Sequence, residues 1–371
     1  MADVVNGVLL NTDCIYFKGD LPCLPHKQHG YHCTCPAYQP IEKRILIIKL
    51  GAIGDVIRTT PLLHKIRKEY PNAKITWLTL TPAILPKGAI DEILKLDFAS
   101  MLYLQQLTFD VLFNLDKDKE ACALHDSLNA TQKFGYTLKN GVAFPSNPLA
   151  NHKYLTGVFD DLSQANTKPY VQEIFELCGW EFNHEEYVFD NHEDKGYNWN
   201  LDRSKPLVGL NTGCGDRWTT RLWSDEKWIK LIELLEQNGY QPVLLGGEQE
   251  HERNHRLAEV TNALYLGYFE LPKFINLMYQ MDLIVTQVTM AMHIAIALQK
   301  KIVLMNNIFN PYEFDLYGRG FIVQPEKQCQ CFYRGTCQFG VSCMEELPAE
   351  KVFEFVEKTL ATEDRILQPL V

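Results

Sequence analysis

An aspartate follows two closely spaced glycines directly after the first strongly apolar run of the chain. In RILIIKLGAIGDVI, Gly51 and Gly54 lie three residues apart, and Asp55 comes where the first turn of a helix is expected. Backbone N–H groups at a helix start favour negative charge, so a carboxylate there stays ionised readily. Such a carboxylate, facing a crevice, can act as a general base for a hydroxyl nucleophile. An ordinary helix cap is the alternative interpretation.

Two loops in the second half of the chain have the residues of a phosphate and ribose site. The first, LNTGCGDRWTTRLW, follows an apolar run, and its backbone N–H groups with Thr212 and Arg221 could hold a diphosphate. The second opens with two glycines, and Glu248 or Glu250 could accept hydrogen bonds from ribose hydroxyls. A solvated, charged loop is the alternative for the first of them.

A third loop opens the apolar helix TMAMHIAIAL. Thr289 stands at its start and His293 lies one turn further on. A single histidine in an apolar helix is more often a packed core residue than a catalyst. Three polar loops that end three neighbouring strands are a stronger indication of a ligand site than any one of them.

The alternation of apolar runs and amphipathic stretches predicts an α/β protein with two doubly wound, Rossmann-like domains that face a central crevice. A polar stretch over residues 190–204 is the expected linker. We expect a Cys/His-rich N-terminal module, an N-terminal Rossmann-like domain, a C-terminal Rossmann-like domain and a C-terminal helix, at residues 1–40, 41–190, 201–345 and 346–371.

Composition excludes several classes of function. The net charge of -10 argues against nucleic-acid binding, which needs a basic face. No apolar run reaches the ~18 residues of a membrane-spanning helix. The apolar segment near the start has no basic flank and does not resemble a secretory signal. We expect a cytoplasmic protein, with contact to the inner face of the membrane as an open alternative.

The eleven cysteines are unevenly placed. Clusters in a cytoplasmic chain favour metal binding over disulfides, and short loop-rich segments often need a metal to fold. We expect a structural four-thiolate site for zinc or iron in the late group, Cys329, Cys331, Cys337 and Cys343. A second candidate site is the early group, Cys14, Cys23, Cys33 and Cys35. Buried thiols or disulfides are the alternative.

The stretch RILIIKLGAIGDVIRTTPLLHKIRKEYPNAKITWLT resembles the opening of glycosyltransferase family 9, the ADP-heptose:lipopolysaccharide heptosyltransferases. The later pieces GLN–G–RW, LLGG–E–E and T–MH–A–AL follow in the family's order, over residues 44–350. The resemblance implies a GT-B fold with an N-terminal acceptor domain, a C-terminal nucleotide-sugar domain, and inverting transfer that requires no metal cofactor. It also implies that Asp55 is the catalytic base and that Arg221 contacts the donor's phosphates.

The loops and the resemblance together give the candidate donor site, which consists of Gly54, Asn211, Thr212, Gly213, Arg221, Gly247, Glu248, Glu250, Thr289, Met290 and His293. The family usually has Asp-Thr-Gly where this chain has Val288, Thr289 and Met290, which leaves the donor open: ADP-heptose by family default, or another nucleotide sugar. Arg58 and Lys65 are candidates for binding an anionic glycan or lipid-linked acceptor, and a solvated helix face is their alternative.

Three functions therefore compete. The first is an inverting glycosyltransferase that transfers a heptose, by family default, to a glycan or lipopolysaccharide-type acceptor. The second is a degenerate family member that binds a nucleotide or glycan without turnover. The third is a redox or metal-sensing protein, suggested by the clustered cysteines.

Overall fold

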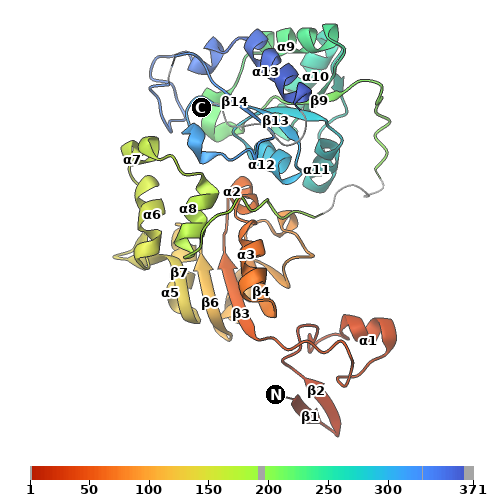
Figure 1. The fold of residues 1–371 in the computed structure, drawn as a ribbon, viewed down its shortest axis with the longest axis vertical. Helices are drawn as coiled ribbons and strands as arrows, with labels where there is room; N and C mark the ends of the chain where they lie inside the picture. The colour runs from red at the N-terminus through yellow and green to blue at the C-terminus, as the bar shows by residue number, and fades with distance from the viewer. Residues whose placement is uncertain (1, 191–196, 328, 363–371) are drawn as a thin grey trace. The chain divides into compact units, whose positions relative to one another are not determined.

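The computed structural model describes residues 2–190, 197–327 and 329–362, so residues 191–196 of the expected linker and 363–371 of the expected C-terminal segment lie outside it. The chain divides into two compact units, each with one six-stranded sheet (Figure 1). The first unit comprises Met1–Ala52, Thr60–Asn151 and Phe175–Trp180. The second comprises Ile53–Thr59, His152–Ile174 and Glu181–Val371.

The first sheet has the order β5-β4-β3-β6-β7-β8, in which only the β7–β8 pair is antiparallel. Its central strand is the apolar run expected as the first strand, and Ile45 to Ile48 have no exposed surface. Strands buried on both faces read as continuous apolar runs, which is why this segment lacks alternation. The strands are β3 (Lys43–Ile48), β4 (Ala73–Thr79), β5 (Glu92–Lys95), β6 (Thr108–Asn114), β7 (Asn129–Lys139) and β8 (Val142–Pro145).

The amphipathic stretch after β3 forms two helices and not one continuous helix. It forms α2 (Ile53–Ile57) and α3 (Leu62–Glu69), with Pro61 directly before α3. Proline has no N–H and its ring clashes with the carbonyl four residues earlier, so a continuous helix ends here. As a result, α2 belongs to the second unit and α3 to the first. The helices that follow are α4 (Phe98–Gln105), α5 (Lys119–Ser127), α6 (Asn151–Thr156), α7 (Asp160–Ala165) and α8 (Tyr170–Leu177).

The second sheet is parallel throughout, with the order β11-β10-β9-β12-β13-β14. Numbered along the chain, both sheets have the order 3-2-1-4-5-6 of dinucleotide-binding domains. The strand order reverses between β9 and β12, where a ligand site is expected at the carboxyl ends. The strands are β9 (Leu207–Asn211), β10 (Gln241–Leu245), β11 (Leu264–Tyr265), β12 (Leu283–Gln287), β13 (Lys301–Met305) and β14 (Gly320–Val323).

Helices cover the second sheet and enclose its core. The C-terminal helix expected from the sequence is α13 (Ala349–Ala361), which packs against α9 (Asp225–Gln237) and β13 (Figure 1). Trp223 and Trp228 lie in this core with their ring centroids 5.1 Å apart. The remaining helices are α10 (His251–Val260), α11 (Leu271–Tyr279) and α12 (Met290–Ala297).

The residues before β3 form a hairpin, a short helix and connecting loops. The elements are β1 (Ala2–Val5), β2 (Val8–Asn11) and α1 (Leu24–His29), and the hairpin pairs with neither six-stranded sheet. Within the described part of the chain, no helix combines the length and apolarity needed to cross a bilayer. The prediction of an α/β protein with Rossmann-like elements is confirmed.

Candidate active site

A cavity of about 430 Å³ opens at the carboxyl ends of β9, β10 and β12, where the second sheet reverses its strand order. Doubly wound sheets bind ligands at this edge. Many of the residues expected to bind a donor line it: Asn211, Gly213, Arg221, Gly247, Glu250, Thr289 and Met290. The loops that sequence patterns singled out therefore meet at one place.

The Asn211 side chain links the loop after β9 to the start of α12. Its Nδ2 donates to the Gly213 carbonyl at 3.0 Å, to Thr286 Oγ1 at 3.1 Å and to Thr289 Oγ1 at 3.5 Å. The residue is only 6% exposed, so these hydrogen bonds are shielded from solvent. The amide therefore holds the two loops of the switch point together.

Glu250 is fixed against two glycines of the cavity wall. Its Oε2 accepts a hydrogen bond from the Gly247 backbone N–H at 2.9 Å. A Cβ at Gly213 would overlap Glu250 Oε1, so the absence of a side chain at residue 213 gives this carboxylate its position. At Gly246 a Cβ would lie 2.6 Å from the Glu250 Cβ. The glycines are required here for close approach, not for an unusual backbone conformation.

Arg221 is a buried cation at the cavity wall. Its Nη2 donates to the Cys214 carbonyl at 2.7 Å and its Nε to the Trp218 carbonyl at 3.3 Å, and it is 6% exposed. Burial lowers the pKa of the guanidinium, although Cys214 opposes that shift. No hydrogen bond within the described residues uses Nη1. That group can therefore donate to an anion in the cavity without breaking an existing bond.

The start of α12 forms another part of the wall. Thr289 is the N-cap, and its Oγ1 accepts from the Ala291 N–H at 3.1 Å. Met290 and Ala291 line the cavity, so the N–H groups of the first turn lie at its edge. A helix N-terminus favours negatively charged groups. Where the family usually has an aspartate, Val288 is 9% exposed and contributes no charge.

One wall of this cavity is apolar, and none of its residues is among the donor-binding residues expected from the sequence. Phe269, Leu271 and Phe274, which lie before and within α11, line it. Leu271 and Phe274 belong to the segment LPKFINLMYQM, whose pattern predicts only a helix. Their position after β11, at the same edge of the sheet as the other loops, was the available signal. Aromatic and aliphatic side chains there could pack against a nucleobase.

Four of the predicted donor residues lie outside the cavity lining. Thr212 is fully buried and its hydroxyl donates to Asn254 Oδ1 at 2.5 Å. Glu248 is exposed at the start of a short 3-10 helix. Gly54 and His293 contact each other instead, since a Cβ at Gly54 would lie 2.5 Å from His293 Cδ2.

His293 is a packed residue beneath α2. Tyr187 Oη lies 3.4 Å from its Nδ1, and the two rings are stacked with centroids 6.3 Å apart. Burial, together with the positive charge of Arg58, lowers the pKa of His293 to about 3. The imidazole is therefore neutral at physiological pH. Its geometry fits the packed-core alternative raised by the sequence.

Asp55 lies in the first turn of α2 and pairs with Arg58. The distance from Asp55 Oδ1 to Arg58 Nη2 is 2.6 Å, and Arg58 Nη1 lies 3.1 Å from Glu313 Oε1. The side chains of Asp55, Arg58 and Glu313 are 34%, 11% and 18% exposed. Ile53, at the start of the same helix, lines the cavity. A partly exposed carboxylate thus lies within one helical turn of the cavity wall.

Further contacts hold Arg58 in place. Its guanidinium carbon lies 3.3 Å from the centre of the Tyr170 ring, and Lys153 Nζ lies 4.4 Å from that same centre. Tyr333 Oη donates to Glu313 Oε2 at 2.8 Å. Burial lowers the pKa of Arg58, but the negative charges of Asp55 and Glu313 act against burial, and the pKa is raised overall. Sequence patterns gave no signal for these partners.

The first unit has its own polar contact where its strand order reverses. Lys49 and Asp116, at the ends of β3 and β6, pair at 3.0 Å with almost no exposure. Asp116 Oδ2 also accepts from the Leu50 and Gly51 N–H groups at 3.0 and 3.3 Å. This carboxylate fixes the loop that precedes α2 in the chain. Lys65, in the same unit, pairs with Glu69 along α3 at 3.1 Å.

The late cysteines lie near one another in the second unit. Cys331 Sγ lies 3.8 Å from Cys337 Sγ, and the Cys331 N–H donates to Cys329 Sγ at 3.3 Å. Burial, together with a hydrogen bond to Cys343, raises the pKa of the Cys329 thiol to about 12. Over the described residues, no three His, Cys, Asp or Glu side chains are arranged to share one metal ion.

Two doubly wound sheets, with a cavity at the switch point of one of them, define an α/β protein with two Rossmann-like units, as in the GT-B class. The family model for glycosyltransferase family 9 (heptosyltransferase) matches residues 104–331, more than half of the chain. This chain belongs to glycosyltransferase family 9 and is a glycosyltransferase, which confirms the resemblance. A comparison with curated proteins gives no match.

Solved structures share its fold at low sequence identity. The glycosyl transferase family 9 protein from Veillonella parvula DSM 2008 has 19% identity and a TM-score of 0.64, over 86% of this chain and 97% of that one. The E. coli ADP-heptose lps heptosyltransferase II has 16% identity and a TM-score of 0.62, over 85% and 98%. The iron-containing dodecameric glycosyltransferase TibC from enterotoxigenic E. coli H10407 has 11% identity and a TM-score of 0.52, over 86% and 76%.

Proposed function

We propose that this glycosyltransferase moves a heptose from ADP-heptose to a hydroxyl of a glycan or lipopolysaccharide-type acceptor, with inversion at the anomeric carbon. Asp55 is the general base in this proposal. The observation that carries it is the position of this carboxylate, paired and partly exposed, two residues after Ile53, the residue of α2 that lines the cavity. A base in that position can reach an acceptor hydroxyl presented at the cavity mouth.

In this proposal each part of the donor contacts a separate wall of the cavity. Phe269 and Phe274 would pack against the base, and Glu250 would accept hydrogen bonds from the ribose hydroxyls. Arg221 Nη1 and the first-turn N–H groups of α12 would bind the diphosphate. ADP-heptose is the donor that the name of the E. coli structural relative gives for that enzyme.

In this proposal the transfer step needs only the donor, the acceptor hydroxyl and the side chains named above. The acceptor oxygen bonds to the anomeric carbon while the bond from that carbon to the phosphate oxygen breaks, and ADP leaves with the electron pair. Asp55 takes the proton of the acceptor hydroxyl. Negative charge grows on the departing diphosphate, and in this proposal Arg221 and the start of α12 stabilise it in place of a metal ion.

We further propose that the first Rossmann-like unit binds the acceptor. Lys65, which lies in this unit, and Arg58, which belongs to the second unit, stay candidates for contact with an anionic saccharide. The guanidinium of Arg58 already pairs with two carboxylates, Asp55 and Glu313. The ammonium group of Lys65 pairs with Glu69 on its own helix, so it is the more available of the two cations for an acceptor. A lipid-linked acceptor would place the reaction at the inner face of the membrane, and no nucleic acid takes part.

A structural zinc or iron ion at Cys329, Cys331, Cys337 and Cys343 is part of this proposal. The donation of the Cys331 and Gln338 N–H groups to cysteine sulfurs, at 3.3 and 3.4 Å, supports it, because such bonds stabilise thiolate ligands. The ion would hold the loop before α13 and would take no part in transfer. Metal analysis of Cys329→Ser against the wild-type protein tests it, and equal metal content in both would overturn it.

The experiment for the transfer itself uses a panel of nucleotide sugars with lipopolysaccharide-type saccharide acceptors. Product formation with inverted anomeric configuration, followed by nuclear magnetic resonance, is the expected result with ADP-heptose. Binding of ADP-heptose without turnover, with every acceptor tried, would instead indicate the degenerate binding protein. Turnover with a different nucleotide sugar would overturn the assignment of the donor and leave the role of Asp55 standing.

A further inference from the structure

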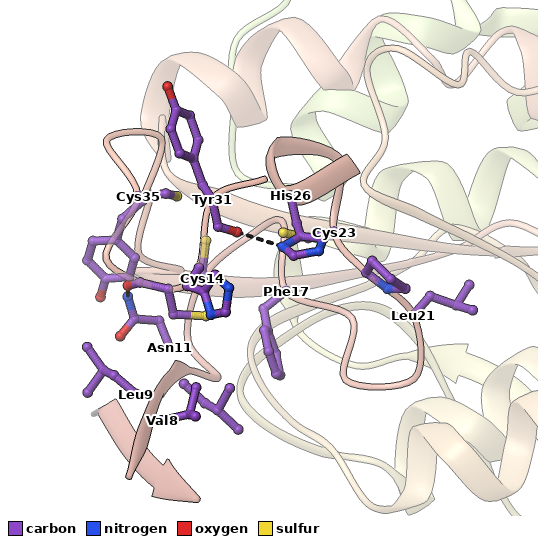
Figure 2. A pocket seen from close by; sticks show the side chains of 15 residues that line it. Val8, Leu9, Asn11, Cys14, Phe17, Leu21, Cys23, His26, Tyr31 and Cys35 are labelled. Carbon is purple, nitrogen blue, oxygen red and sulfur yellow. Dashed lines mark hydrogen bonds between the residues drawn. The ribbon is translucent and has the colours of Figure 1, made fainter. Parts of the chain in front are cut away.

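A second cavity lies in the N-terminal module, the residues before β3. Its volume is about 230 Å³, and it is enclosed by β2, α1 and the loops around them (Figure 2). Four thiols and two imidazoles line it: Cys14, Cys23, Cys33, Cys35, His26 and His32. Every cysteine of the module lines this one cavity, although they are spread over 22 positions of the chain.

The module has almost no core that could hold these groups together. Among residues 3–41 only Cys14 and Pro25 are buried, while Val4, Leu21 and Leu24 are each more than half exposed. A segment of this size seldom folds on apolar burial alone and is usually stabilised by disulfides or by a bound metal. The soft ligands therefore occupy the place that apolar side chains have in a larger domain.

Hydrogen bonds fix the backbone around the cysteines. Asn11 Nδ2 donates to the Cys33 carbonyl at 2.6 Å, which ties the end of β2 to the later loop. An isolated antiparallel bridge joins Cys14 to Pro40. The Cys23 carbonyl accepts from the Lys27 N–H at 3.0 Å at the start of α1. The thiols thus come from three backbone segments that are held at one cavity.

His26 has the arrangement of a metal-binding imidazole. Its Nδ1 lies 2.9 Å from the Tyr31 carbonyl oxygen, and a dashed line in Figure 2 marks this hydrogen bond. A carbonyl oxygen can only accept, so Nδ1 carries the hydrogen and the neutral ring keeps its lone pair at Nε2. Metal-bound histidines commonly donate their second N–H to a backbone carbonyl in this way. The ring of His32 lies 5.7 Å from that of His26.

We propose that this cavity binds a divalent metal ion of the zinc class through cysteine thiolates and His26 Nε2. Sulfur and imidazole nitrogen are the donors that zinc and ferrous iron take in structural sites. Each thiol that coordinates releases its proton to solvent, and no redox step is involved. Since no three of these groups share one point in the described structure, binding draws the side chains inward and couples metal uptake to ordering of the module.

The test uses the full chain purified without added metal, and compares variants of the module with matched controls. His29 lies in α1, three residues after His26, and does not line the cavity; Cys178 is a buried thiol of the first unit outside the module. The paired variants are His26→Ala with His29→Ala, and Cys23→Ser with Cys178→Ser. Elemental analysis and titration with Co²⁺, followed by thiolate-to-cobalt absorption, give the occupancy. The late cysteines remain intact in all variants.

We expect His26→Ala and Cys23→Ser each to lower metal content by one equivalent per chain and to remove one of the Co²⁺ transitions. The two control variants should retain the wild-type values. Resistance of the module to protease should fall on chelation in the wild type and be low from the start in Cys23→Ser. Equal metal content across all four variants, or alkylation showing the early cysteines joined in disulfides, would overturn the proposal. If only the late cysteines bind metal, His26→Ala and Cys23→Ser will have the metal content of the wild type, and this result would also overturn the proposal.

Discussion

The Arg58 guanidinium pairs with the Asp55 carboxylate three residues earlier on α2, with 2.6 Å between Nη2 and Oδ1. The same guanidinium pairs with Glu313, which is 255 residues away in the sequence. One cation is therefore shared by two carboxylates, and the group as a whole keeps a negative charge. Asp55 is held in a defined position without being neutralised, which is what a general base needs.

Replacing Asp55 by asparagine removes the base and keeps the size of the side chain. We expect kcat to fall about 10²–10⁴-fold, the usual contribution of a positioned acid–base group. Affinity for ADP should stay nearly unchanged, because Asp55 does not line the cavity of the second unit. Steady-state kinetics and calorimetric titration with ADP give the two values. Wild-type turnover in this variant would exclude Asp55 as the base.

Arg58 should act as a positioning residue for Asp55. Arg58→Met removes the cation, and we expect kcat to fall about 10–100-fold because the carboxylate is no longer held. The acidic limb of the rate profile should move to higher pH, since a carboxylate beside a cation stays ionised to lower pH than one without it. Arg58→Lys should recover part of the activity.

The control for this prediction is Arg67→Met. Arg67 pairs with Asp91 at 2.8 Å in the first unit and is 32% exposed. Its loss should leave the pH profile in place. An unshifted profile in Arg58→Met, with turnover lowered only through a lower melting temperature, would reduce Arg58 to a structural role.

The sequence predicted the parts of the site that lie at strand ends and helix starts. Asn211, Arg221, Glu250 and Thr289 were found because parallel strands bring their carboxyl ends to one edge of the sheet. Glu313 was not found, because its pairing with Arg58 depends on packing between segments far apart in the chain.

Two further features of the structure do not follow from apolar periodicity in the sequence. Phe274 was missed because apolar periodicity is the same for a core face and for a cavity wall. Apolar periodicity also runs through the break before α3, and only Pro61, whose ring ends a helix, marks that break in the sequence. Sequence patterns therefore identify the loops of the site, whereas contacts between side chains far apart in the chain are seen only in the three-dimensional structure.

Arg221→Ala should weaken nucleotide binding. A charge-assisted contact contributes about 1.5–3 kcal/mol, so the Kd for ADP should rise by about 10- to 100-fold. The variant also leaves the carbonyls of Cys214 and Trp218 without their donor, so the melting temperature must be measured alongside. Arg221→Lys keeps a charge and should bind ADP better than the alanine variant. Unchanged ADP affinity in both would remove Arg221 from the donor site.

His293 should make stability depend on pH. Its pKa is about 3 in the folded protein and ordinary in the unfolded chain, so below about pH 6.5 the unfolded state binds more protons. Unfolding therefore becomes easier as pH falls from 6.5 towards 3, by at most about 1.4 kcal/mol per pH unit for one group. His293→Gln should flatten this dependence, measured by urea denaturation. His255→Gln, on the exposed side of α10, is the control and should retain the wild-type slope.

Gly213→Ala tests whether the position of Glu250 matters for the nucleotide. The added Cβ would overlap the end of the Glu250 side chain, which is flexible and can turn away with little effect on the fold. Turning away breaks its hydrogen bond with the Gly247 N–H and moves the carboxylate from the cavity wall. We expect the Kd for ADP to rise about tenfold, or about 1.4 kcal/mol, with a nearly unchanged melting temperature.

A double-mutant cycle makes this prediction specific. If Gly213→Ala acts through Glu250, then adding it to Glu250→Ala should cost no further affinity, because the displaced group is already gone. Gly88→Ala, where a Cβ meets no atom within 4 Å, controls for the effect of the substitution itself. Additive losses in the double variant would mean that Gly213 contacts the nucleotide directly and that Glu250 is not the group it positions.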